Sequence, residues 1–198
     1  MIFQGIIFDL DGVICSTDEY HYQAWKELAD QEGIPFDRSV NNRLRGVSRM
    51  ESLEILLERA KRSYSQEEKE KMAAAKNTRY QELLREMTPA DLSPEVFETL
   101  ETLRKQGLKL AIGSSSKNTP LILDRLGLGG YFDAVSDGNN ITRSKPDPEV
   151  FLKAAEYLGL SPETCLVVED AVSGVEAAHR AGMKAAALGD AAKTGVGE

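Results

Sequence analysis

The amino-acid sequence predicts an α/β protein with a parallel sheet and an inserted domain made of helices. From Pro94 onward, short β-type runs alternate with helical patterns, which is typical of a parallel sheet. Between Thr17 and Pro89 the apolar residues follow the helical period instead. Since this helical stretch comes after the first strand-like segment, we expect a core domain at residues 1–16 and 89–198 and a helical cap domain at residues 17–88.

The first expected strand is the apolar N-terminal segment that ends at Asp9-Leu10-Asp11-Gly12. Two carboxylates at the tip of a buried strand repel each other and lose hydration, which destabilises the fold. Their presence therefore indicates a cation-binding or catalytic role. Mg²⁺ prefers such oxygens together with water and substrate phosphate. Open α/β sheets bind ligands at the carboxyl ends of their strands. The alternative is that Asp11-Gly12 is an ordinary turn.

The helical stretch holds two capping boxes, one from Ser48 to Glu51 and one from Ser65 to Glu68. Later helices are expected to open at a proline that follows a capping residue, at Ser93-Pro94, Thr119-Pro120 and Asp147-Pro148. The remaining strands are expected near residues 108–112, 132–135, 165–168 and 183–188, with a helix at 172–181. After the last strand we expect a glycine-containing tail, the mark of a shortened chain.

Composition narrows the classes of function. The 198 residues are 41% hydrophobic, which is enough for a buried core. Lysine and arginine number 24 against 32 acidic residues, a net charge of -8, so nucleic acids and anionic membranes are poor partners. No apolar stretch reaches the roughly 20 residues of a membrane span, and no secretion signal is evident. We therefore expect a cytoplasmic protein whose Cys15 and Cys165 are free thiols.

Four expected strand ends carry polar groups that should meet at one edge of the sheet. They are Asp9 with Asp11, the run Ser114–Asn118, Lys145-Pro146, and Glu169-Asp170. A carboxylate nucleophile, an acidic metal site, a hydroxyl and a lysine together suit phosphoryl transfer. Taken singly, Asp170, Ser116 or Asn118 could cap a helix, and Lys145 could be a solvated surface residue. The occurrence of these groups at four successive strand ends, in this order, favours a site for phosphoryl transfer over separate capping and surface roles.

These residues resemble the four motifs of the haloacid dehalogenase superfamily, over nearly the whole chain. The resemblance implies a Rossmann-like core with an inserted cap. It implies that Asp9 is the nucleophile, that Asp11 is the general acid and base, and that Ser114 and Lys145 bind the transferring phosphoryl oxygens. It also implies a Mg²⁺ ion held by Asp9, the Asp11 carbonyl and Asp170, with Glu169 beside it.

Within that superfamily, the expected cap segment resembles the β-phosphoglucomutases, which act on sugar phosphates through a glucose 1,6-bisphosphate intermediate. The residues that this resemblance assigns to substrate binding are Thr17, His21, Trp25, Gly46, Val47, Ser48, Arg49, Ser52, Lys76, Ser114, Ser116, Lys117, Asn118 and Lys145. It implies that His21 couples substrate binding to cap closure and that Trp25 is a wall of the sugar pocket. The expected partner is a small sugar phosphate, and the expected state is a monomer.

A mutase differs from a phosphatase because it must exclude water and hold phosphate at either end of the sugar. The helix that starts at Ser48 offers a second anion site, since free N–H groups attract phosphate and Arg49 can add a bidentate contact. Arg49 could also be a solvated first-turn residue. Lys76 falls in an apolar helical stripe, where it either snorkels to the edge or contacts substrate. Trp25 could equally be a core residue.

The predicted mutase has four rival functions. A sugar-phosphate phosphatase of the same superfamily would share every core residue and differ only in the cap. A dehalogenase is disfavoured because it does not need Asp11, and a phosphonate hydrolase needs a Schiff-base lysine for which the cap has no clear candidate. A non-catalytic Mg²⁺-dependent module is disfavoured by the intact set of polar residues.

Overall fold

The computed structural model describes residues 3–44 and 47–195. It contains a parallel sheet of five strands in the order β3-β2-β1-β4-β5. The chain forms two compact units, one of residues 1–16 and 87–198 and the other of residues 17–86. The predicted α/β class, with a parallel sheet, is confirmed. That the two units act as a hinged core and cap stays a prediction.

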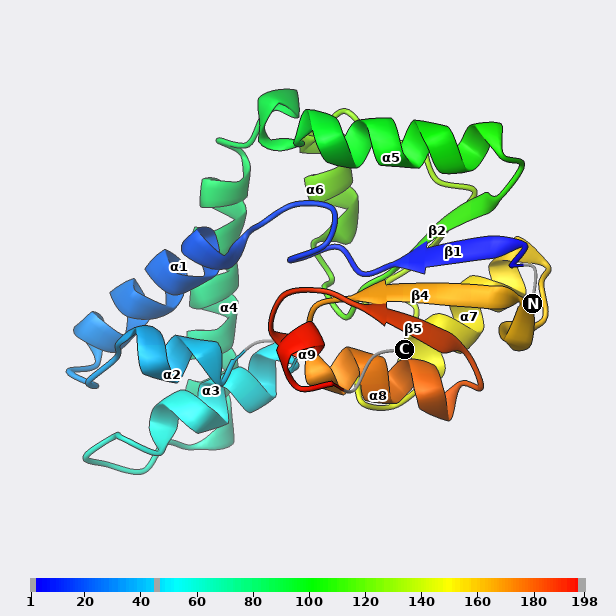
Figure 1. Ribbon diagram of the computed structural model, residues 1–198. Helices are drawn as coiled ribbons and strands as arrows, with labels where there is room; N and C mark the ends of the chain where they lie inside the picture. The colour runs from blue at the N-terminus through cyan, green and yellow to red at the C-terminus, as the bar shows by residue number, and fades with distance from the viewer. Residues whose placement is uncertain (1–2, 45–46, 196–198) are drawn as a thin grey trace. The chain divides into compact units, whose positions relative to one another are not determined.

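The α/β unit alternates strands and helices along the sequence (Figure 1). Its strands are β1 (Gly5–Phe8), β2 (Lys109–Gly113), β3 (Ala134–Ser136), β4 (Cys165–Glu169) and β5 (Lys184–Ala187). Its helices are η1 (Pro89–Asp91), α5 (Pro94–Lys105), α6 (Thr119–Arg125), α7 (Glu149–Leu158), η2 (Pro162–Thr164), α8 (Val172–Arg180) and α9 (Gly189–Lys193). The strand order reverses between β1 and β4, which is where ligands bind in folds of this kind.

Apolar side chains on the strands explain this sheet. Strand β1 is buried along its whole length, as expected for a central parallel strand covered on both faces. Ile7, Ala111 and Val167 pack with Phe151 of α7 and Val175 of α8 in one core cluster. Figure 1 shows α5 on the opposite side of the sheet from α7 and α8. Because helices cover both faces of the sheet, the polar groups of the strands lie at the carboxyl ends.

The helical unit consists of α1 (Asp18–Gln31), α2 (Arg38–Asn42), α3 (Arg49–Leu57) and α4 (Gln66–Leu84). Both predicted capping boxes are present, with Ser48 and Glu51 opening α3 and Ser65 and Glu68 opening α4. Trp25 of α1, Leu53 of α3 and Met72 of α4 belong to one buried cluster. Trp25 is therefore a core residue of this unit, as one of the two interpretations of the sequence held.

Three local expectations are wrong. Thr119 does not cap α6, because the capping position is Asn118 and the Thr119 hydroxyl donates to the Ser116 carbonyl instead. Asp147 lies one residue before the capping position of α7, which is Pro148, although its carboxylate accepts from the Glu149 N–H. The segment after β5 is not a plain tail, because residues 189–193 form α9. The first two concern helix starts, where several polar side chains compete for the same N–H groups.

Both cysteines are free and buried in the α/β unit, as predicted. Loss of hydration raises the pKa of the Cys15 thiol, and the charges of Asp11 and Asp9 raise it further. Burial also raises the pKa of Cys165. The two thiols are core residues and take no part in the site described below. In the described residues, no helix is long and apolar enough to cross a bilayer.

Candidate active site

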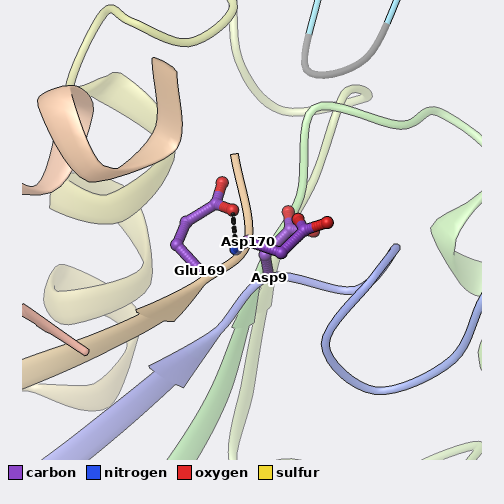
Figure 2. Close-up of side chains that lie close together, drawn as sticks. All are labelled: Asp9, Glu169 and Asp170. Carbon is purple, nitrogen blue, oxygen red and sulfur yellow. Dashed lines mark hydrogen bonds between the residues drawn. The ribbon is translucent and has the colours of Figure 1, made fainter. Parts of the chain in front are cut away.

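Three carboxylates converge at the carboxyl ends of β1 and β4. Asp9 follows β1, Glu169 is the last residue of β4, and Asp170 comes next (Figure 2). Each can offer one oxygen to a group whose members all lie within 4.8 Å of one another. Hard carboxylate oxygens in such a cluster are the ligands that Mg²⁺ prefers. The donor set therefore fits the cation that the sequence predicts.

Lys145 lies among these carboxylates and is not a solvated surface residue. Its ammonium donates to Asp9 Oδ1 over 2.5 Å and to Glu169 Oε1 over 2.8 Å, and the residue is only 4% exposed. Burial lowers the pKa of Lys145, but the attraction of Asp9 and Glu169 outweighs it and leaves the pKa raised. The lysine is therefore a fixed positive charge beside Asp9.

Burial raises the pKa of Asp9 to about 7, although Lys145 opposes that rise. The negative charges of Glu169 and Asp11 raise it further. A carboxylate must be ionised to act as a nucleophile. Since positive charge favours the ionised form, a cation bound beside Asp9 would act in the same direction as Lys145.

The Glu169 carboxylate is held on both of its oxygens. Oε1 accepts from Lys145, and Oε2 accepts from the backbone N–H groups of Asp170 at 2.6 Å and Ala171 at 2.9 Å. Gly174 of α8 lies so close that a Cβ there would be 1.6 Å from Oε1. Glu169 thus joins the start of α8 to Lys145. Its direct binding to a metal stays a prediction.

Gly12 allows Asp170 to approach the loop after β1. Its φ is +96°, a backbone conformation that side chains other than glycine rarely adopt. A Cβ at this position would lie 2.1 Å from Asp170 Oδ2. The Asp-x-Asp-Gly sequence therefore brings its own backbone against the Asp170 carboxylate. Among the described residues, the three-carboxylate cluster does not include Asp11, and the role of Asp11 stays a prediction.

The segment Ser114–Asn118, which we call the serine loop, follows β2. The Ser116 N–H donates to Ser114 Oγ, and the Asn118 N–H donates to Ser116 Oγ. Each of these hydroxyl oxygens accepts a hydrogen bond from a backbone N–H. Each hydroxyl can therefore still donate a hydrogen bond to another acceptor, such as a phosphate oxygen. Ser114 and Asn118 are buried, whereas Lys117 is exposed. The loop belongs to the same sheet edge as Asp9.

Sequence reasoning missed Glu149, the first residue of α7. Its Oε2 accepts from the N–H groups of Thr142 and Arg143 and from the Thr142 hydroxyl, each over 2.9 Å. These backbone bonds lower the pKa of Glu149 to about 2. They anchor the segment that leads to Lys145. The only signal in the sequence is a glutamate in a first helical turn, which is too common to be specific.

In the helical unit, four of the predicted residues form one group, in which three side chains are buried and His21 is partly buried. The Lys76 ammonium lies 2.8 Å from His21 Nδ1 and 4.8 Å from the centre of the Trp25 ring. Lys76 is 3% exposed, so the snorkelling interpretation is wrong. Thr17 joins this group because Tyr80 donates a 2.9 Å bond to its hydroxyl. The Tyr80 ring, one turn after Lys76 on α4, stacks on the His21 ring with the two ring centres 4.0 Å apart.

The remaining predicted residues of this unit surround the start of α3. Ser48 is the capping residue of α3, Arg49 is its first residue, and Ser52 is buried one turn later. Val47 precedes them and is partly buried. The Ser48 hydroxyl already accepts from Glu51 N–H, which is its capping role. Gly46, which is also predicted to bind substrate, lies outside the described residues.

The chain matches known proteins over most of its length. Residues 3–182 match a family model described as haloacid dehalogenase-like hydrolase. The protein belongs to this family. The predicted superfamily is therefore confirmed, and family membership implies dependence on Mg²⁺. A cluster of carboxylates that could hold such an ion is present.

Two of the proteins that this chain is similar to are β-phosphoglucomutases. A β-phosphoglucomutase of Bacillus subtilis is 45% identical over 94% of this chain and 83% of its own length. The solved structure of a β-phosphoglucomutase from Clostridium difficile is 38% identical, with a TM-score of 0.92 over 99% of this chain and 89% of that one. A phosphorylated carbohydrates phosphatase of Thermotoga maritima is 35% identical over 91% of this chain and 82% of its own. The predicted resemblance to the mutases is confirmed.

Proposed function

We propose that the protein is a Mg²⁺-dependent β-phosphoglucomutase, which interconverts β-D-glucose 1-phosphate and D-glucose 6-phosphate. The observation that carries the proposal is the 45% identity to the Bacillus subtilis mutase, because it covers the helical unit as well as the α/β unit. Only the helical unit distinguishes a mutase from a phosphatase of this family. The proposal includes a monomer that acts on small sugar phosphates in the cytoplasm, as the sequence predicts.

The chemistry takes place on Asp9. A carboxylate oxygen of Asp9 attacks the phosphorus of glucose 1,6-bisphosphate, and the bond from phosphorus to the sugar oxygen breaks. Asp11 gives its proton to that leaving oxygen. In the reverse step, Asp11 takes the proton of a sugar hydroxyl while the hydroxyl oxygen attacks the aspartyl phosphate. Glucose 1,6-bisphosphate is therefore both the primer and the intermediate.

Charge neutralisation makes this attack feasible. We propose that Asp9, the Asp11 carbonyl and Asp170 hold Mg²⁺, with Glu169 beside it. When bound, the cation neutralises phosphoryl charge, as metal ions do in phosphoryl transfer. Lys145 is already ion-paired with Asp9, so its ammonium can contact the same phosphoryl oxygens. Ser114 adds a hydroxyl donor.

The substrate's sugar and second phosphate need further contacts. We propose that the serine loop supplies Ser116, Lys117 and Asn118. The helical unit would supply the residues around α3 and the group around Lys76. The full set from that unit is Thr17, His21, Trp25, Gly46, Val47, Ser48, Arg49, Ser52 and Lys76. Since the N-terminus of a helix is suited to an anion, the start of α3 is the proposed site of the non-reacting phosphate.

The alternative function is a sugar-phosphate phosphatase, which the 35% identity to the Thermotoga maritima enzyme favours. In that case water attacks the aspartyl phosphate. The deciding experiment supplies β-glucose 1-phosphate, Mg²⁺ and a catalytic amount of glucose 1,6-bisphosphate, and measures both products. A mutase forms mainly glucose 6-phosphate, whereas release of mainly inorganic phosphate would establish the phosphatase.

A pair of isosteric variants tests the nucleophile. Asp9→Asn removes the attacking oxygen's charge, so turnover and phosphoenzyme formation should both be lost. Asp124→Asn, on the exposed face of α6, is the matched control and should keep full activity. Phosphoenzyme can be measured by mass spectrometry after acid quenching. Full turnover by Asp9→Asn would overturn the mechanism.

A further inference from the structure

The serine loop is held from behind by a turn of the same unit, residues Asp137–Asn140, which we call the bracing turn. Gly113 and Ser136 are register partners at the ends of β2 and β3. The Ser114 N–H continues this pairing by donating to the Ser136 carbonyl over 3.0 Å. The serine loop and the bracing turn therefore leave neighbouring strands side by side.

Two hydrogen bonds join the bracing turn to the serine loop. The Gly138 N–H donates to the Ser116 carbonyl over 3.2 Å. The Asn139 side chain donates from Nδ2 to the Lys117 carbonyl over 3.0 Å. Both bonds end on backbone oxygens of the loop, so they constrain its path whatever side chains it carries.

Gly138 also packs directly against the backbone of the serine loop. A Cβ at this position would lie 2.5 Å from the Ser115 carbonyl oxygen and 2.8 Å from the Lys117 nitrogen. Both contacts are with backbone atoms, which cannot move aside as a flexible side chain could. Any residue larger than glycine would therefore push the serine loop away from β3.

The bracing turn is itself fixed by an independent set of bonds. Asp137 Oδ1 accepts from the Asn139 N–H over 2.8 Å, and the Asp137 carbonyl accepts from the Asn140 N–H over 3.1 Å. Asn140 Oδ1 accepts from the Asp137 N–H and the Ser136 hydroxyl, and the Asn140 carbonyl accepts from Lys153 of α7. Asp137 is only 4% exposed. The turn can therefore act as a rigid support.

Holding a carbonyl fixes the whole peptide unit. Because the peptide bond is planar and trans, the Ser116 carbonyl and the Lys117 N–H point in opposite directions, as do the Lys117 carbonyl and the Asn118 N–H. By binding the two carbonyls, the bracing turn sets the direction of both N–H groups. It also sets where the Lys117 and Asn118 side chains start.

We propose that Gly138 and Asn139 are positioning residues for phosphate binding by the serine loop. The inference rests on the proposed function, in which Ser116, Lys117 and Asn118 contact the substrate. Neither residue needs to touch substrate. Their effect is to hold the loop in the geometry that binds phosphate before the substrate arrives, which lowers the cost of ordering it.

The first test removes the donor of Asn139. Asn139→Ala and the nearly isosteric Asn139→Asp both lose the bond to the Lys117 carbonyl, with Asn42→Ala, at an exposed helix end, as the control. One lost hydrogen bond of ~0.5–1.5 kcal/mol predicts that the KM for β-glucose 1-phosphate rises by ~3–10-fold. The concentration of inorganic phosphate that half-inhibits turnover should rise by a similar factor, while kcat changes less. A KM and an inhibition within twofold of the wild type in both variants would overturn the proposal.

The second test uses two glycines that share ordinary backbone dihedrals but differ in surroundings. Neither Gly138 nor Gly129 is among the glycines with positive φ. A Cβ at Gly129 has nothing nearer than 3.7 Å, so Gly129→Ala should leave phosphate binding unchanged. Gly138→Ala should weaken it at least as much as Asn139→Ala. Equal phosphate binding by the two glycine variants, with both folded by circular dichroism, would also contradict the proposal.

Binding of inorganic phosphate separates this inference from the proposed function. The rise in melting temperature on adding phosphate with Mg²⁺ can be measured whether or not glucose 6-phosphate is formed. If the wild type makes no glucose 6-phosphate but Asn139→Ala reduces the phosphate-induced shift, the mutase proposal fails and the positioning role stands. If the wild type is a mutase and the shift is unchanged in every variant, only the positioning role fails.

Discussion

Lys76 of α4 donates a hydrogen bond to Nδ1 of His21 of α1 over 2.8 Å. An ammonium group can only donate, so Nδ1 is the acceptor and the imidazole is neutral, with its proton on Nε2. Loss of hydration lowers the pKa of His21 well below its usual value, and the positive charges of Lys76 and Arg49 lower it further. The pair thus keeps one buried charge and one uncharged ring.

This relationship predicts a pH dependence of stability. The unfolded histidine has a pKa of about 6.5 and the folded one a lower pKa, so below pH 6.5 the unfolded chain binds more protons. The free energy of unfolding should therefore fall as pH drops through that value, by up to about 1.4 kcal/mol per pH unit. Denaturant titrations from pH 5 to pH 8 measure it. His21→Asn keeps an acceptor but cannot titrate, so the wild-type minus variant difference should shrink towards acidic pH; a constant difference contradicts the assignment.

Magnesium should stabilise the folded protein through the carboxylate cluster. Three carboxylates close together repel each other, and a bound cation relieves that repulsion. We expect Mg²⁺ to raise the melting temperature by several degrees in the wild type and much less in Asp170→Asn. Asp11→Asn should keep the rise but lose turnover, because its proposed metal ligand is the backbone carbonyl. Loss of the rise in Asp11→Asn would move its side chain into the metal site.

Gly174 should be intolerant of any side chain. A Cβ there would displace the Glu169 carboxylate and, through it, Lys145. We expect Gly174→Ala to lower the free energy of unfolding by ~1–3 kcal/mol and to impair turnover, even though alanine is the better helix former. Ser173→Ala, one residue earlier in α8, is the control. An active, fully stable Gly174→Ala protein would show that Glu169 has room to move.

Ser115 should be dispensable, unlike its neighbour Ser114. Its hydroxyl is buried and has no hydrogen-bond partner among the described residues. Removing an unpaired buried polar group costs nothing and can stabilise the fold by ~1 kcal/mol. Ser115→Ala should therefore have an equal or higher melting temperature and normal turnover, whereas Ser114→Ala should lose turnover. A drop in turnover for Ser115→Ala would assign its hydroxyl to the substrate.

Arg49 should matter for the second phosphate and little for folding. A cation in the first turn of α3 opposes the helix dipole, so its removal costs no helix stability. Arg49→Ala should raise the concentration of glucose 1,6-bisphosphate needed for half-maximal activation by ~10-fold or more, a loss typical of a charge-assisted bond. Arg85→Ala, at the exposed end of α4, is the control. Equal activation of the two variants would remove Arg49 from the site.

Much of the fold follows from short-range patterns in the sequence. The strands were predictable because apolar β-type runs recur between helical patterns, and both capping boxes of the helical unit were found by their spacing. The place of Lys76 in an apolar stripe was predictable because a helix has a fixed period, but the sequence left open whether its ammonium reaches the surface. Its partner could not be deduced in that way, since His21 is 55 residues earlier in the sequence.

The parts that could not be predicted depend on contacts between distant segments. Nothing near Glu149 in the sequence shows that its carboxylate collects the N–H groups of Thr142 and Arg143. The contact between the bracing turn and the serine loop could not be predicted either. An Asp-Gly-Asn-Asn sequence indicates a turn but not which segment packs against it. The predicted cap at Thr119 is wrong because Thr119 is already the first residue of α6, where its hydroxyl donates to the Ser116 carbonyl three residues earlier.

The reactivity of the two buried thiols reports on local opening of the native protein. Both belong to the α/β unit, and the chain contains no other cysteine. A thiol reagent added to the native protein can react only when that unit exposes its interior, because burial both blocks access and disfavours the thiolate. The labelling rate of Cys165, which belongs to the core cluster around the sheet, therefore measures the opening of the α/β unit without any introduced probe.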